Sequence, residues 1–145
     1  MTQENKELLL KDLYTRIPYG VKICYTEPEY RIKSVCDVDY IYIYSNGNIL
    51  CRTPYIIYNI ENCLLYLRSL SSMTQEEISD LQKINYQFSF NRFDNLAYVG
   101  AADNGFCSVE DMNNILDYLN SHHFDHRHLI EKGLALEAPE GMYNY

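Results

Sequence analysis

The stretch VKICYTEPEYRIKSVCDVDYIYIYSNGNILCR, residues 21–52, decides the fold class of this chain. Branched and aromatic residues, which favour extended backbone, recur there between short groups of turn formers. Asn46-Gly47 near its end is the strongest short hairpin signal, because both residues tolerate positive φ. The pattern predicts four strands, and a fifth follows after them: Val21–Tyr25, Tyr30–Val35, Asp39–Tyr44, Asn48–Arg52 and Cys63–Arg68.

Helical patterns flank the strand region on both sides. A first helix is predicted over residues 5–17, where an apolar face recurs at helical spacing: Leu10, Leu13, Tyr14 and Ile17. A second begins at Thr74, which forms a capping box with Glu77, and a third begins at Ser108 and carries an apolar stripe. The sequence therefore predicts one α+β domain spanning residues 1–145. We expect a curled antiparallel sheet or small barrel of about five strands, with an N-terminal helix and two C-terminal helices.

Charge and composition exclude several classes of protein. Of 145 residues, 47% are hydrophobic, which suits a single packed core, and the net charge is −8. Residues 36–145 hold fifteen acidic against six basic side chains, so direct contact with nucleic-acid phosphates is disfavoured. No secretion signal, membrane-spanning run or phosphate-binding glycine loop occurs, and we expect a cytoplasmic protein without membrane contact or cofactor.

The cysteines agree with that compartment. They are odd in number, widely spaced and contain no C-x-x-C pair, whereas a disulfide framework in a secreted protein needs an even number. We therefore expect free thiols that mostly pack as small apolar residues, at Cys24, Cys36, Cys51, Cys63 and Cys107.

Tyrosine is unusually frequent, with fifteen residues and no tryptophan. In the third predicted strand Tyr40, Tyr42 and Tyr44 alternate with Ile41 and Ile43, so phenols line one face and aliphatic side chains the other. The isoleucine face suits the core. The three tyrosines are therefore the candidate contact surface for a protein partner, because tyrosine offers a large area at low entropic cost.

A histidine cluster offers a competing interpretation. His122, His123, His126 and His128 surround Asp125, and His122 and His126 have the i,i+4 spacing that can hold zinc on a helix. His122, His126, His128 and Asp125 form the alternative ligand set. We favour a structural role, in which the histidines extend the apolar stripe of the last helix and pack at its end.

Several segments carry a family resemblance. They are RIPYGV at 16–21, YLRSLSSMT at 66–74, HHFD at 122–125 and GLALEAPEGMY at 133–143. Together they resemble a family of uncharacterised small proteins from gut anaerobic bacteria and their phages and mobile elements. The resemblance implies a phage or prophage origin and no established activity.

Three functional hypotheses follow from the sequence. The leading one is a non-enzymatic interaction module that binds a protein partner through an acidic, tyrosine-rich surface. The second is a metal-dependent enzyme or metal-binding protein that uses the His122–His128 cluster. The third is a nucleic-acid-associated regulator in which the small barrel is the reader.

Overall fold

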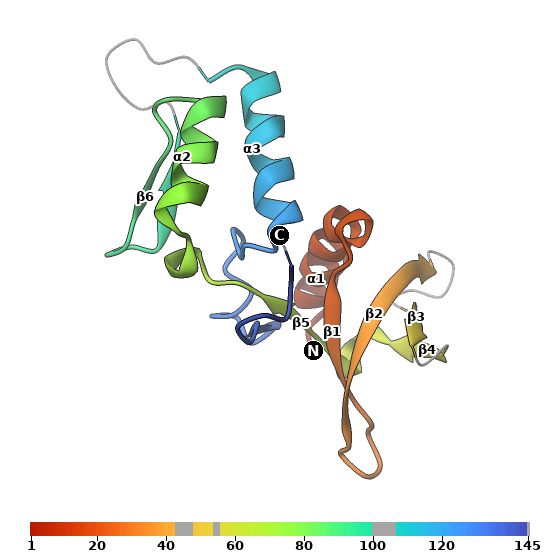
Figure 1. Ribbon diagram of the computed structural model, residues 1–145. Helices are drawn as coiled ribbons and strands as arrows, with labels where there is room; N and C mark the ends of the chain where they lie inside the picture. Colours follow the sequence, from red (N-terminus) through yellow and green to blue (C-terminus); the bar gives the residue numbers. More distant parts are fainter. Residues whose placement is uncertain (43–47, 54–55, 100–106, 145) are drawn as a thin grey trace.

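The computed structural model describes residues 1–42, 48–53, 56–99 and 107–144 (Figure 1). The helices are α1 Gln3–Arg16, α2 Gln75–Ile84 and α3 Val109–Ser121. The strands, in chain order, are β1 Lys22–Thr26, β2 Lys33–Tyr42, β3 Asn48–Thr53, β4 Ile56–Asn59, β5 Cys63–Leu67, β6 Ser89–Asn91, β7 Leu96–Tyr98 and β8 Ala135–Glu137.

A mixed sheet of six strands forms one half of the molecule, in the order β4-β3-β2-β1-β5-β8. The first five strands of the chain pair antiparallel, but β8 runs parallel to β5, with Leu65 opposite Ala135. The α+β class is confirmed. The barrel is wrong, because β4 and β8 lie at opposite edges of an open sheet in the described part of the chain. The nucleic-acid hypothesis assigned the reader role to a small barrel, and the described sheet does not form one.

Strand β2 corrects the predicted boundaries. Two strands separated by a turn at Cys36-Asp37 were expected, but one ten-residue strand passes through that point. Cys36 pairs with Ile23 in the core, and Asp37 pairs with Lys22, whose ammonium lies 2.6 Å from the carboxylate. This cross-strand partnership replaces the turn. Asn46-Gly47 lies outside the described residues.

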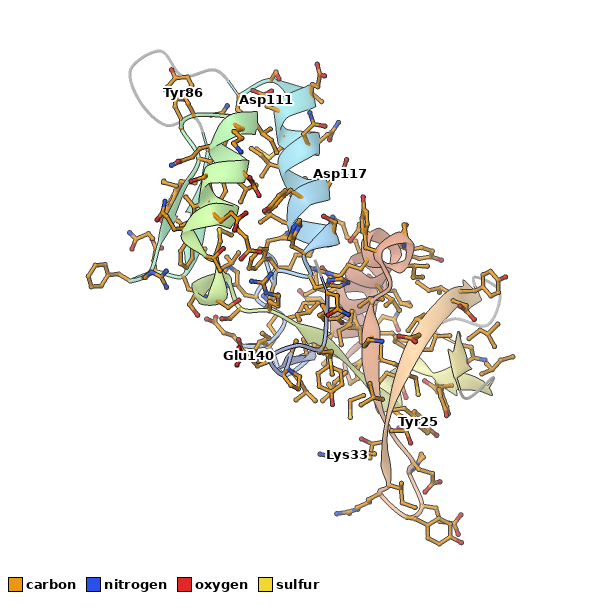
Figure 2. All side chains as sticks on the ribbon, viewed as in Figure 1. Tyr25, Lys33, Tyr86, Asp111, Asp117 and Glu140 are labelled. Atoms are coloured by element: carbon orange, nitrogen blue, oxygen red, sulfur yellow. The ribbon has the colours of Figure 1, made fainter. Side chains whose placement is uncertain are left out.

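The strand pair β1–β2 forms a long hairpin that projects beyond the rest of the sheet (Figure 1). Tyr25, which still pairs with Cys63 of β5, lies at the base of this projection (Figure 2). Tyr25 stacks on Tyr58 of β4 at 3.6 Å between ring centroids, so an aromatic pair supports the base of the projection.

Two hydrophobic clusters fill the interior. The first lies between α1 and the six-stranded sheet, and its members include Leu9, Leu13, Ile23, Ile49, Leu65 and Leu129. The second lies among α2, α3 and the β6–β7 hairpin, and its members include Leu70, Met73, Leu81, Phe88, Ile115 and Phe124. The segment after α3 reaches both clusters, because Phe124 belongs to the second and Leu129 to the first.

Helix α1 begins and ends close to its predicted bounds, and Gly20 follows it with φ of 73°. Its buried face differs from the expected one, since Tyr14 is exposed whereas Leu9, Leu13 and two charged residues are buried. Asp12 and Arg16 are fully buried on that face because they pair with each other, with Arg16 Nε 2.7 Å from Asp12 Oδ2.

The other two helices lie side by side, as Figure 1 shows, and both start at predicted caps. Thr74 and Glu77 form the capping box, and Ser108 accepts the backbone N–H of Asp111. The description of the two as C-terminal helices was wrong, because α2 lies mid-chain and the β6–β7 hairpin separates it from α3. Residues 124–132, which follow α3, form non-helical turns. None of the described helices has the length and apolar composition that a bilayer span requires.

Candidate functional site

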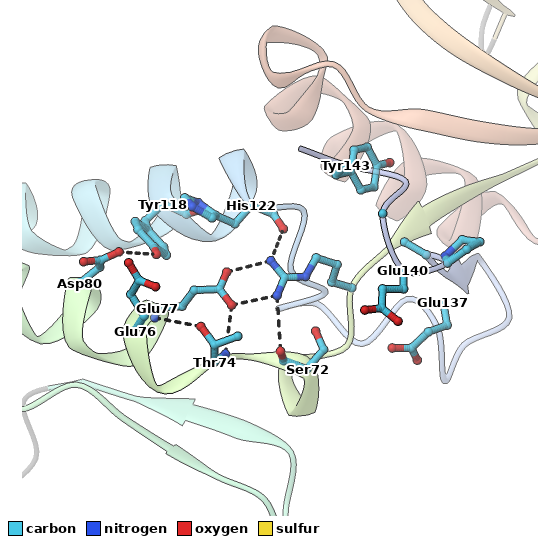
Figure 3. A pocket seen from close by; sticks show the side chains of 14 residues that line it. Ser72, Thr74, Glu76, Glu77, Asp80, Tyr118, His122, Glu137, Glu140 and Tyr143 are labelled. Atoms are coloured by element: carbon cyan, nitrogen blue, oxygen red, sulfur yellow. Dashed lines mark hydrogen bonds and ion pairs between the residues drawn. The ribbon is translucent and has the colours of Figure 1, made fainter. Parts of the chain in front are cut away.

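A cleft of about 640 Å³ opens where α2, the C-terminal end of α3 and the tail after β8 meet (Figure 3). We call it the acidic cleft. Its lining includes one arginine and one histidine, and it includes carboxylates from both the α2 side and the tail: Glu76, Glu77, Asp80, Glu137 and Glu140. Five carboxylates facing one guanidinium give the cleft a negative potential, which a concave wall concentrates.

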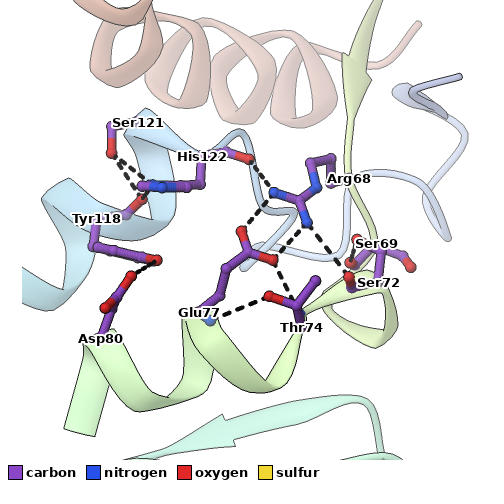
Figure 4. Close-up of polar contacts among 9 residues, drawn as sticks. All are labelled: Arg68, Ser69, Ser72, Thr74, Glu77, Asp80, Tyr118, Ser121 and His122. Carbon is purple, nitrogen blue, oxygen red and sulfur yellow. Dashed lines mark hydrogen bonds and ion pairs between the residues drawn. The ribbon is translucent and has the colours of Figure 1, made fainter. Parts of the chain in front are cut away.

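The single arginine is committed to the protein itself. Arg68 donates to both carboxylate oxygens of Glu77, at 2.8 and 2.9 Å (Figure 4). Its guanidinium also lies 4.2 Å from the ring centroid of Phe124. Such a bidentate, stacked arrangement is stronger than a simple ion pair and fixes the guanidinium. Arg68 therefore neutralises Glu77. Of the other four carboxylates, Asp80 lies 3.3 Å from the ammonium of Lys83, and the remaining three form no ion pair with a described residue.

The capping box places Glu77 against this arginine. Thr74 Oγ1 accepts the backbone N–H of Glu77 at 3.2 Å, while Glu77 Oε1 accepts the backbone N–H of Thr74 at 3.0 Å. Burial alone would raise the pKa of Glu77, but the hydrogen bonds from Arg68 and Thr74 outweigh it and hold the pKa below its usual value. Glu77 is therefore ionised at neutral pH.

The remaining carboxylates differ in how far the protein uses them. Asp80 accepts a hydrogen bond from the Tyr118 hydroxyl at 3.1 Å, and Glu137 accepts the backbone N–H of Ser69 at 3.3 Å. Neither Glu76 nor Glu140 forms an ion pair with any described residue. These two carboxylates, one on each side of the cleft, are available to a cationic ligand.

Aromatic side chains form part of the wall. Tyr118 stacks on His122 with ring centroids 3.9 Å apart, and burial together with the bond to Asp80 raises the pKa of the Tyr118 phenol. On the other side Tyr143 donates to the carbonyl of Tyr66 at 2.8 Å and accepts the backbone N–H of Lys22 at 2.9 Å. The acidic cleft thus combines carboxylates with tyrosines held in fixed positions.

Three of the four predicted metal ligands are engaged separately by the protein itself. His122 Nδ1 lies 3.0 Å from the carbonyl of Tyr118, and His126 Nε2 lies 2.8 Å from Asn120 Oδ1. Asp125 accepts the backbone N–H groups of Leu129 and Ile130, which closes the turn after α3, and His128 has φ of 59° within this segment. Across the described ranges, no three His, Cys, Asp or Glu side chains are grouped as a metal site would require.

His123 and His126 instead lie near a buried charge cluster. Arg16 is fully buried between Asp12 and the carbonyl of Phe124, and Arg127 adds a second guanidinium 3.5 Å from Asp12. Burial, followed by the charge of Arg16, lowers the pKa of both His123 and His126 from 6.5 to about 4. Both imidazoles are neutral at pH 7.

Of the three predicted contact tyrosines, only Tyr40 has a described side chain. A bulge after Val38 shifts the register of β2, so Val38 is buried while Tyr40 pairs with Leu50 and is 61% exposed. Ile41 packs against the first cluster, as the alternation predicted. Tyr42 lies in β2, Tyr44 lies outside the described residues, and a contact role for the three tyrosines stays a prediction.

Sequence patterns indicated the acidic cleft only through its charge. Glu76 and Glu77 lie at the start of α2, whereas Glu137 and Glu140 lie near the C-terminal end of the chain, so no local pattern brings the two groups together. No protein-family model, no curated protein and no solved structure matches the chain, and the resemblance to the family from gut anaerobes stays a prediction.

Proposed function

We propose that this chain is a non-enzymatic interaction module that binds a protein partner, and that the acidic cleft receives a lysine- or arginine-bearing segment of that partner. The observation that carries the proposal is the surplus of carboxylates in a cleft whose single arginine is already paired with Glu77. Glu76 and Glu140, on opposite sides, are the side chains that would meet the incoming cation.

The aromatic wall supports the same class of ligand. A guanidinium or ammonium group gains from contact with an aromatic face as well as from a carboxylate, and Tyr118 and Tyr143 both line the cleft. These two tyrosines support the proposal, although they are not the tyrosines that the sequence predicted as a contact surface. Tyr40 belongs to a separate surface on the sheet, where it would serve as a second contact.

The compartment and origin belong to the same proposal. A cytoplasmic protein of phage or prophage origin, as the resemblance implies, would meet host proteins that carry basic segments. Association driven by an acidic surface is fast and weakens as salt rises, because charge attraction guides the encounter.

The test uses a defined probe because the partner is unidentified. A fluorescent eight-residue peptide of alternating lysine and serine is titrated with the protein by fluorescence anisotropy, with a glutamate–serine peptide as its negative counterpart. The double variant Glu76→Gln/Glu140→Gln should weaken binding of the lysine peptide about tenfold or more, since two charge-assisted contacts are lost.

The matched control separates the cleft from overall charge. Glu131→Gln/Asp117→Asn removes two negative charges at exposed positions that do not line the cleft. This control should keep the affinity within about twofold of the parent. Equal weakening by both double variants would show that the peptide responds to net charge alone, and the proposed role of the cleft would then be wrong.

A further inference from the structure

A second cavity, separate from the acidic cleft, lies within the α2–α3 half of the molecule. It has a volume of about 260 Å³ and is bordered by the β6–β7 hairpin, by α3 and by the turn that follows α3. Nine of its eleven lining residues are apolar, and the other two are His126 and His128. Such a ratio is typical of small-molecule pockets, in which a few polar groups orient a mostly apolar ligand.

The floor and the mouth of this cavity can be told apart by exposure. Leu70, Phe88 and Ile115 on the floor are at most 2% exposed, whereas Leu96 and Met112 are each 38% exposed and mark the mouth. The floor belongs to the second hydrophobic cluster. An apolar cavity of this kind loses dispersion contacts when empty, so a ligand that fills it stabilises the fold.

His126 gives the cavity one defined polar atom. Its Nε2 donates to Asn120 Oδ1 at 2.8 Å, so in the neutral ring Nδ1 carries a lone pair that can accept a hydrogen bond. The ring offers no positive charge to a carboxylate at neutral pH. Burial and the charge of Arg16, which Asp12 only partly offsets, disfavour a cation there.

We propose that this cavity binds a small uncharged molecule with an aromatic or branched aliphatic body and one hydroxyl group, which donates to His126. The apolar walls take the body of the ligand, and its hydroxyl replaces the water that an exposed acceptor would otherwise hold. The size suits a single ring with a short substituent. The inference is independent of the acidic cleft and adds a small-molecule site to the proposed interaction module.

The experiment compares phenol, toluene and benzoate as probes. Binding to the full chain is followed by protein-observed NMR titration, together with the shift of the melting temperature at saturating probe. We expect saturable binding of phenol and toluene, a raised melting temperature with both, and no saturable binding of benzoate at the same concentration. Absence of saturable phenol binding, or equal binding of benzoate, would overturn the proposal.

Two kinds of variant locate the site. Leu116→Trp on α3 fills the cavity and should abolish binding of both neutral probes, while Asn113→Trp, at an exposed position of the same helix, should leave binding unchanged. If Leu116→Trp does not fold, Ala97→Leu fills the cavity from the opposite wall. Binding that persists in a folded filling variant would place the probes elsewhere and contradict the inference.

A third variant tests the hydrogen bond itself. In His126→Phe the ratio of phenol affinity to toluene affinity should fall about fivefold, which is the effect of losing one ordinary hydrogen bond. The ratio cancels changes in cavity shape that affect both probes alike. An unchanged ratio would refute the role assigned to His126.

Discussion

Neutralising Asp12 should destabilise the fold more than changing any surface acid. Asp12 and Arg16 are both fully buried, and Asp12 accepts from Arg16 Nε at 2.7 Å and from Nη2 at 3.2 Å. The other terminal nitrogen of Arg16, Nη1, has no hydrogen-bond partner among the described residues. Asp12→Asn keeps the shape but leaves a buried guanidinium without its counter-charge.

The expected cost follows from the burial of both partners. Removing one member of a buried ion pair costs about 3–5 kcal/mol, because the remaining charge is poorly solvated. A domain of this size has a free energy of unfolding of roughly 5–15 kcal/mol, so the variant should sit near the limit of folding. Urea denaturation at pH 7, followed by circular dichroism, measures the loss. Asp117→Asn, an exposed change of the same type, should stay within about 0.5 kcal/mol of the parent.

A double variant checks the reasoning from the opposite direction. Asp12→Leu/Arg16→Met replaces the pair with apolar side chains and removes both buried charges. It should cost only about 1–3 kcal/mol, because the carbonyl of Phe124 loses its 2.7 Å bond from Arg16 and the partly exposed Arg127 loses its contact with Asp12. If Asp12→Asn costs less than about 1 kcal/mol, or if the double variant is as unstable as the sum of the two single variants, the buried-pair argument is refuted.

Four other outcomes are expected. The pKa of His123 and of His126 is about 4 in the fold rather than 6.5, so the unfolded chain takes up protons before the folded chain as pH falls. The free energy of unfolding should therefore be highest above about pH 6.5 and decline towards pH 4. Urea denaturation at each pH measures this decline, which should be shallower in His126→Gln. A chelator should leave the melting temperature unchanged, since the candidate imidazoles of His122 and His126 each have their own protein partner; near-stoichiometric zinc in the purified protein would contradict this. Thiol titration in denaturant without reductant should find five groups per chain, and three or fewer would indicate disulfides. Thr74→Ala should cost about 1 kcal/mol in thermal or urea unfolding, because the capping box is lost; an unchanged stability would show that the cap is not formed in solution.

Local signals predicted the parts of the fold that local contacts determine. Thr74 and Ser108 started their helices as expected because a cap is a hydrogen bond between residues three apart. Strand β2 could not be predicted in full, because Cys36-Asp37 resembles a turn until Lys22 and Ile23 pair with it across the sheet. The helix caps could be predicted because their partners are close in the sequence, whereas the pairing of β2 depends on residues of another strand.

Charged residues misled the interpretation of α1. The predicted apolar face included Tyr14, which is exposed, and left out Asp12 and Arg16, which are buried although charged residues rarely are. Their i,i+4 spacing was the available signal. The acidic cleft had no comparable signal in the sequence, because Glu76 and Glu140 come together only through the tertiary fold.

The hydrogen bond from Tyr143 to the carbonyl of Tyr66 can form only late in synthesis on the ribosome. These residues are 77 apart in the chain, and a ribosome adding about 5–20 residues per second needs roughly 4–15 seconds to pass from one to the other. During that interval β5 has its antiparallel neighbour β1 but lacks β8 on its other side. The nascent chain therefore exposes an unpaired edge of β5 and an incomplete cleft during these seconds. An unpaired strand edge can pair with another chain, so this is the stage of synthesis at which a chaperone would prevent aggregation most effectively.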